Sequence, residues 1–101
     1  MKTLVQLQST DFVPYLNQTF TVRQKGIKPI GLELVLVTES RTGIRSGARQ
    51  RFALYFLGPE SPQYLLQNTY RLEHPEMGVL NLFLVPRALQ AGRMRYEAIF
   101  G

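Results

Sequence analysis

The chain has one histidine, His74, and it lies between two carboxylates in the run Glu73-His74-Pro75-Glu76. A histidine beside a carboxylate is typical of general acid–base catalysis, and both residue types bind metal ions. A metal site needs three or four converging ligands, yet the sequence has no second histidine and no cysteine. Neighbouring residues of a strand also point to opposite faces of a sheet. We therefore expect His74 to bond a backbone carbonyl and shape a turn, and we predict no metal and no cofactor.

The other carboxylates and hydroxyls form no recognisable catalytic set. A glycosidase needs two carboxylates at a fixed separation, and nothing in the sequence fixes the distances among Glu73, Glu76 and Glu97. We expect these glutamates to pair across strands with three arginines, which are Arg71, Arg93 and Arg95. No serine lies in a G-x-S-x-G motif, and no glycine run has the spacing and the lysine of a Walker loop. The sequence therefore predicts a protein that is not an enzyme.

A basic segment, residues 40–51, is the predicted binding surface. It contains no acidic residue and four arginines, which are Arg41, Arg45, Arg49 and Arg51. A guanidinium group binds a carboxylate or a phosphate through two hydrogen bonds at once. We expect these arginines to contact an acidic surface of a protein partner. The alternative is that the segment, together with nearby aromatic rings, binds single-stranded nucleic acid or another polyanion.

The positive charge is concentrated in the first half of the chain. The net charge is +5, and residues 1–51 hold eight lysines and arginines against three acids, whereas residues 52–101 hold four of each. Such an imbalance favours a negatively charged partner. The aromatic residues fall mostly on apolar alternating faces, as core residues do, and this favours a protein partner over nucleic acid.

Alternation of apolar and polar residues predicts six strands around these candidates. The strands are expected over residues 17–24, 30–38, 51–57, 69–73, 79–85 and 94–100. Glycine and proline place turns at residues 25–26 and 74–78 and a loop at 58–62. Pro86 is expected to end the fifth strand, and residues 87–92 to connect it to the last one.

A short helix is expected before the first strand. Thr10 and Asp11 would cap it, Phe12 would begin it, and Pro14 is tolerated in its first turn. We expect this helix to cover one end of the β structure. The predicted core consists of apolar residues on the inward faces of the strands, which are Phe20, Val22, Leu32, Leu34, Leu36, Leu54, Phe56, Leu72, Leu82, Leu84, Tyr96 and Phe100.

The short connections leave no room for the crossover helix of a βαβ unit, and a chain of 101 residues is one domain by size. We therefore predict a single domain over residues 1–101 with an all-β fold. Its architecture is expected to be a mostly antiparallel barrel or two-sheet sandwich of about six strands, with a short N-terminal helix.

Five sequence blocks stand out, in the order FTVR, RFALYFLGP, TYRLEHPEMG, LFLVP and MRYEAIF, over about residues 11–100. Together they resemble a family of small bacterial all-β domains of unknown function, and TYRLEHPEMG is the most specific block. The resemblance implies genes that lie near those of phage-tail-collar-like proteins, and it assigns no catalytic residue. The basic segment 40–51 lies between the blocks, so the resemblance does not inform its role.

These observations predict a non-catalytic protein-interaction or assembly module, associated with a phage-tail-like or collar assembly. The first residues contain no apolar run long enough for a signal peptide, and no segment approaches the ~18 apolar residues of a membrane helix. We therefore expect a cytoplasmic location and no membrane contact. The expected partner is an acidic protein surface or a component of a tail-like assembly, and the oligomeric state is left open.

Overall fold

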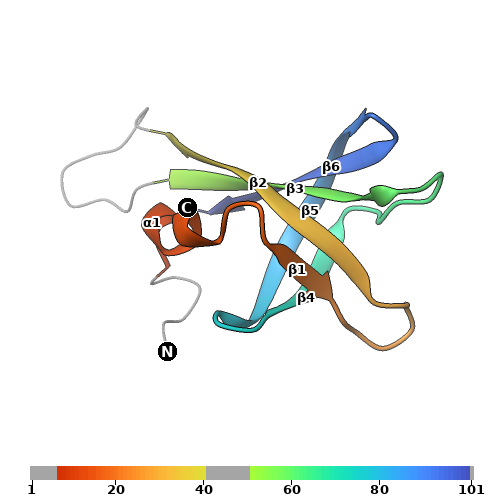
Figure 1. Cartoon of the computed structure of the whole chain (residues 1–101), viewed down its shortest axis with the longest axis horizontal. Coiled ribbons are helices and arrows are strands. Elements are labelled where there is room, and N and C mark those ends of the chain that lie inside the picture. The colour runs from red at the N-terminus through yellow and green to blue at the C-terminus, as the bar shows by residue number, and fades with distance from the viewer. Residues whose placement is uncertain (1–6, 41–50, 101) are drawn as a thin grey trace.

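The computed structural model describes residues 7–40 and 51–100, and of Ser40 only the backbone. Its strands form one closed antiparallel barrel in the order β1-β2-β3-β6-β5-β4 (Figure 1). The strands are β1 (Thr19–Val22), β2 (Ile30–Ser40), β3 (Arg51–Glu60), β4 (Asn68–His74), β5 (Gly78–Gln90) and β6 (Arg93–Phe100). The all-β prediction is confirmed, and of its two architectures the barrel is the one that forms.

Two short helical segments precede β1 and lie at one end of the barrel (Figure 1). They are helix α1 (Ser9–Phe12) and a 3₁₀ turn, η2 (Val13–Tyr15). The carboxylate of Asp11 accepts a hydrogen bond of 2.8 Å from the backbone N–H of Gln8, so it caps the helix from inside the first turn. The helix is therefore confirmed, but it begins at Ser9 and not at Phe12. No helix in residues 7–40 and 51–100 is long and apolar enough to cross a membrane.

Phe12 closes this end of the barrel. Its side chain is fully buried, and its ring centroid lies 5.9 Å from that of Phe52 and 5.5 Å from that of Phe100. The rings of Phe52 and Phe100 are themselves stacked, with centroids 4.5 Å apart. The helix thus covers one end of the β structure, as the sequence predicted.

Side chains from the inward faces of the strands fill the barrel. Eleven of the twelve predicted core residues are buried there, and the exception is Leu36, which is 44% exposed. The core also includes buried residues outside that list of twelve, which are Leu7, Phe12, Phe52, Leu65, Tyr70, Leu80, Met94 and Ala98.

The prediction that Leu36 lies in the core is wrong because β2 contains a bulge. Leu34 is opposite Phe56 in β3, but Leu36 is opposite Tyr55, so Val35 is an extra residue with no partner. One extra residue reverses the faces of every side chain that follows it. Leu36 therefore points outward, and Val37 packs against the core in its place.

Two strands run at least three residues further at their ends than predicted. Strand β3 includes residues 58–60, and β5 continues past Pro86 to Gln90. The pairing of each strand with β6 shifts in register at these points. In β3 the shift leaves Pro59 out of the ladder, where no N–H is needed. In β5 the residue left out is Arg87, and Pro86 lies opposite Tyr96 in a stretch that pairs with β6 alone, because the pairing with β4 ends at Leu84; a proline is tolerated in a strand with one unpaired edge. The β5–β6 turn then needs only Ala91 and Gly92, whose φ angles of 51° and 79° are both positive, as the tightest hairpins require.

The barrel closes through a short seam between β1 and β4. Only two residue pairs join these strands, Thr21 with Glu73 and Val22 with Leu72. One further backbone hydrogen bond extends the seam, from the N–H of Arg23 to the carbonyl of Arg71 over 3.0 Å.

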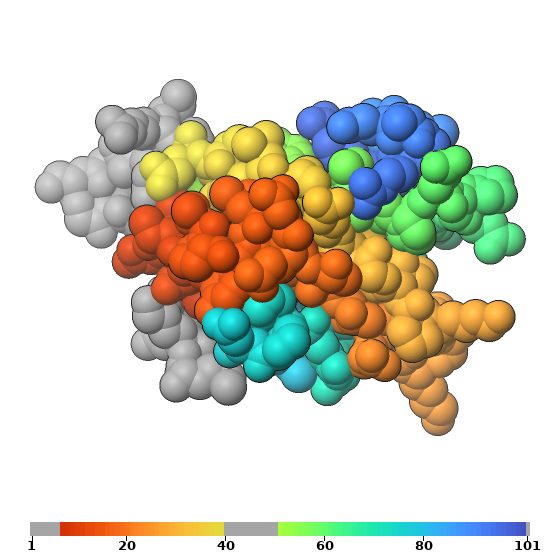
Figure 2. Space-filling model, viewed as in Figure 1, coloured from red at the N-terminus to blue at the C-terminus, as the bar shows by residue number. Residues whose placement is uncertain are grey.

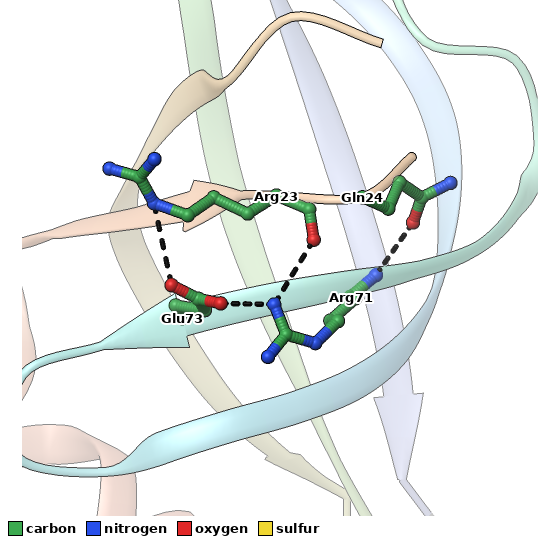
Figure 3. A network of polar contacts seen from close by, with 4 residues as sticks. All are labelled: Arg23, Gln24, Arg71 and Glu73. Carbon is green, nitrogen blue, oxygen red and sulfur yellow. Dashed lines mark hydrogen bonds and ion pairs between the residues drawn. The ribbon is translucent and has the colours of Figure 1, made fainter. Parts of the chain in front are cut away.

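Side chains reinforce the seam where the ladder ends (Figure 3). The backbone N–H of Arg71 donates to Oε1 of Gln24 over 2.9 Å, and the guanidinium of Arg71 donates to the carbonyl of Arg23 over 3.3 Å. The Glu73 carboxylate lies between two guanidinium groups: it pairs with Arg71 and lies 3.4 Å from Nε of Arg23. Polar side chains thus add to the few backbone hydrogen bonds that join β1 to β4 and close the barrel.

Leu34 and Leu36 offer a matched test of the bulge. Leu34→Ala removes a fully buried side chain and should lower the free energy of unfolding by about 2–5 kcal/mol. Leu36→Ala, two residues along the same strand, should cost less than about 1 kcal/mol because the side chain is partly exposed. Urea unfolding followed by circular dichroism measures both values. Equal losses at the two sites would mean that β2 has no bulge at Val35.

Candidate functional site

Three of the four arginines predicted to bind a partner, Arg41, Arg45 and Arg49, lie outside the described residues. Arg51 is the exposed first residue of β3, opposite the backbone of Ser40 in β2. It lies at the end of the barrel that carries α1 (Figure 1).

His74 ends β4 and is only 5% exposed. Its Nδ1 atom accepts hydrogen bonds from the backbone N–H groups of Glu76, at 3.1 Å, and Met77, at 3.3 Å. Because Nδ1 accepts, the neutral ring carries its proton on Nε2, which lies 2.7 Å from Oε1 of Gln18 and donates to it. His74 therefore shapes the β4–β5 turn as predicted. The predicted carbonyl partner is wrong, because the turn presents N–H groups to the ring.

The predicted ion pairs are confirmed only in part. Glu73 pairs with Arg71 as predicted, although the two residues lie in the same strand, β4, and not across strands. The other acids have different partners because the strand registers and the closure of the barrel bring distant segments together. The observed contacts are Glu97 to Nε of Arg87 at 3.8 Å, Glu97 to the hydroxyl of Tyr55 at 2.5 Å, Glu76 to the hydroxyl of Tyr15 at 3.2 Å, and Arg93 to Glu33 at 3.2 Å. Arg95 instead lies over the ring of Tyr55, 5.1 Å from its centroid.

Across the described residues, no three histidine or acidic side chains are grouped as a metal ion requires.

A pocket of about 430 Å³ opens at the end of the barrel opposite α1. Three segments that are distant in sequence form its walls: the β1–β2 turn, the β3–β4 loop and the start of β6. Apolar side chains from each segment line it, among them Ile27, Ile30, Pro59 and Met94. The charged residue that lines it is Lys28. In Figure 2 the β1–β2 turn and the β3–β4 loop project separately at the right, and the surface is hollowed between them.

Two tyrosines hold the β3–β4 loop against the barrel. The hydroxyl of Tyr96 in β6 accepts a hydrogen bond of 2.8 Å from the backbone N–H of Leu65, and the hydroxyl of Tyr70 in β4 donates one of 2.6 Å to the carbonyl of Leu66. Gly58 leaves room for the Tyr96 ring, since a Cβ atom there would lie 3.2 Å from Cε2 of Tyr96. The pocket wall is therefore fixed from two strands.

Burial is the main cause that raises the pKa of Tyr96 above the ordinary tyrosine value of 10.0. The nearby Tyr70 and Tyr64 raise this pKa further, whereas the hydrogen bond from the N–H of Leu65 lowers it. Tyr96 is only 2% exposed and also lines the pocket. A neutral hydroxyl is therefore present at the pocket at physiological pH.

A second hollow of about 410 Å³ adjoins the pocket, because Ser61 and Tyr64 line both. We call the two together the end groove. Large apolar side chains are exposed along it and beside it: Tyr64 is 49% exposed, Leu89 63% and Leu66 72%. The loop that carries two of these residues is ordered by the tyrosine contacts above, so their exposure is a property of the fold and does not reflect a loose loop.

The groove was not predicted from the sequence. The available signal was the placement of Tyr64, Leu65 and Leu66 directly after a loop rich in glycine and proline, where apolar side chains have no alternating strand to bury them. The other wall comes from the β1–β2 turn, and no local pattern shows that these segments meet.

The raised pKa of Tyr96 predicts a pH dependence of stability. Because the pKa is higher in the folded than in the unfolded chain, the stability linked to the neutral hydroxyl is complete below pH 10 and is lost as the pH rises through the folded pKa. The free energy of unfolding of the wild type should therefore fall between about pH 9.5 and 11.5, a range around the usual tyrosine pKa of ~10. Tyr96→Phe should reduce this fall, as measured by urea unfolding at each pH. An identical fall in wild type and variant would contradict the burial of this hydroxyl.

Comparison with other proteins gives a family but no activity. No curated protein and no solved structure matches the chain. A family described as a domain of unknown function (DUF6916) matches residues 7–100, which include every strand of the barrel and helix α1. The chain therefore belongs to this family of domains of unknown function, DUF6916.

Proposed function

We propose that this domain is a non-catalytic protein-interaction module that binds an extended segment of a partner protein in the end groove. The observation that carries the proposal is a pocket of about 430 Å³ at the barrel end with exposed apolar side chains around it. Ligand pockets are commonly ~300–1,000 Å³ and mostly apolar, with a few polar groups that fix orientation. The polar residues that line this pocket are Lys28, Ser61, Gln63 and the two tyrosines, Tyr64 and Tyr96.

A protein segment suits the groove for two reasons. Tyrosine and large aliphatic residues are frequent anchors of protein interfaces, and Tyr64 stands between the two hollows, where a segment that fills both would contact it. The chain has a net charge of +5, and Lys28 is an exposed cation in the pocket wall, whereas Glu60 is an exposed anion that lines the second hollow. The favoured partner segment therefore has apolar anchor residues and carries its carboxylate at the pocket, near Lys28.

The resemblance noted in the sequence supports a more specific partner. Genes that lie near those of phage-tail-collar-like proteins favour a component of a tail-like assembly, and we propose such a component as the partner. The proposed setting is the cytoplasm, where such particles are assembled. The partner and the location are parts of the proposal, and the family membership does not establish either.

The basic segment 40–51 supports the alternative function, binding of single-stranded nucleic acid or another polyanion. Its described arginine, Arg51, lies at the α1 end of the barrel, whereas the end groove lies at the other end (Figure 1). Variants can therefore test the two surfaces separately.

Selection from a random peptide library displayed on phage tests the proposal. Wild-type protein should enrich acidic peptides with a bulky apolar residue, and the double variant Tyr64→Ala, Leu66→Ala should bind them at least about 10-fold more weakly, because interface tyrosines often contribute more than about 1 kcal/mol. Phe83→Ala is the matched control: Phe83 is 50% exposed, like Tyr64, but it lies on β5 away from the groove. It should bind the peptides within about 2-fold of wild type, since surface changes off the interface cost little.

Three results would contradict the proposal. No enriched peptide, or equal losses in the groove variant and the Phe83 control, would remove the groove as the binding surface. Tight binding of a single-stranded oligonucleotide that the triple variant Arg41→Ser, Arg45→Ser, Arg49→Ser abolishes would instead favour the polyanion function. Unchanged unfolding midpoints in all variants serve as the control for folding.

A further inference from the structure

The Tyr96 hydroxyl has a hydrogen-bond donor that the fold does not use. A phenolic hydroxyl accepts and also donates, and here the oxygen accepts from the N–H of Leu65. Within residues 7–40 and 51–100, its own proton has no protein acceptor, although Tyr96 is 2% exposed and lines the pocket. Because Tyr96 lines the pocket, its hydroxyl can donate to a group that is bound there, and a ligand with an oxygen at that place would be bound more tightly than one without it.

The lining of the pocket restricts what can carry that acceptor. The lining is mostly apolar and includes Ile30, Pro59 and Met94, with Ser61, Gln63 and Lys28 as polar members beside the tyrosines. Methionine sulfur makes favourable contacts with aromatic rings, and flat rings pack well against proline and tyrosine. A ligand that fills this space needs a flat apolar body with one oxygen at its tip.

We infer that the pocket binds a tyrosine side chain of the partner segment, whose phenolic oxygen accepts the hydrogen bond that the Tyr96 hydroxyl donates. The inference rests on the proposed function and adds the identity of the anchor residue. Lys28, in the same pocket wall, adds a preference for a carboxylate next to that tyrosine. The recognised sequence is therefore an acidic tyrosine-containing segment.

The test uses two small molecules, p-cresol and toluene, which reproduce the side chains of tyrosine and phenylalanine. Each is titrated into the full chain, and binding is followed by nuclear magnetic resonance at the methyl groups of Met94 and Ile30. The quantity of interest is the ratio of the two dissociation constants, toluene over p-cresol. This ratio isolates the contribution of the oxygen, because both molecules have the same ring and methyl group.

Two variants locate the donor. Tyr96→Phe keeps the ring but removes the hydroxyl, and the ratio should fall by about 3- to 10-fold, the effect of one neutral hydrogen bond. Tyr70→Phe is the matched control: it also removes a hydroxyl that holds the β3–β4 loop, through Leu66, but Tyr70 does not line the pocket. The ratio should stay at the wild-type value in this variant.

The outcomes separate the inference from the proposed function. If neither molecule shifts the Met94 and Ile30 signals, the pocket is not a binding site, and both the inference and the groove proposal are wrong. If both molecules bind but Tyr96→Phe leaves the ratio unchanged, only the tyrosine inference is wrong. An equal fall of the ratio in Tyr96→Phe and Tyr70→Phe would assign the effect to the loop and would also overturn the inference.

Discussion

The closure of β1 on β4 is the constraint on which the rest of this structure depends. A sheet of six strands becomes a barrel only if its two edge strands pair, and in this sheet the edge strands are β1 and β4. Here β1 has only four residues, and it pairs with β4 over two residue pairs. Side chains of the residues that follow β1 complete the junction by contacting Arg71 and Glu73 in β4 (Figure 3). The closure hides the edges of both strands, and it also decides which loops become neighbours.

The end groove is a direct consequence of that closure. The β1–β2 turn leaves β1, and the β3–β4 loop enters β4, so pairing β1 with β4 places this turn and this loop at the same end of the barrel. One wall of the pocket then comes from residues 27–30 and another from residues 59–65. Tyr70 and Tyr96 fix the loop through hydrogen bonds to its backbone, so the groove is formed before any partner arrives. A preformed site has a lower entropic cost of binding than a loop that must order on contact.

The fold could be predicted from the sequence because its strands have regular alternation. The interior of a small barrel accepts every second side chain, and this pattern identified six strands and eleven of twelve predicted core residues. The twelfth, Leu36, was wrongly placed in the core, because a bulge reverses the inward and outward faces of a strand without any change in composition. Pro86 was taken as the end of β5, but past Leu84 the strand pairs with β6 alone, and a proline is tolerated where one edge of a strand is unpaired.

The candidate site could not be predicted in the same way. Its walls are a turn and a loop without periodicity, and what joins them is a strand pairing between residues 21–22 and 72–73, about fifty positions apart. His74 shows the same limit at smaller scale: its place in a turn was predictable, but its bond to Gln18 depends on the packing of β4 beside the segment before β1. Charge drew attention to segment 40–51, whereas the groove is defined by apolar residues that composition alone does not distinguish from core.

Photo-crosslinking in cells that make the protein naturally would test the central claim most directly, namely that the groove formed by barrel closure receives a partner. A benzophenone-bearing residue would replace Tyr64 in one version of the chain and Phe83 in another, two sites of similar exposure of which only Tyr64 lines the groove. The account predicts a single crosslinked partner from position 64, joined through an acidic segment that contains tyrosine, and none from position 83. A crosslink from position 83 alone would contradict it.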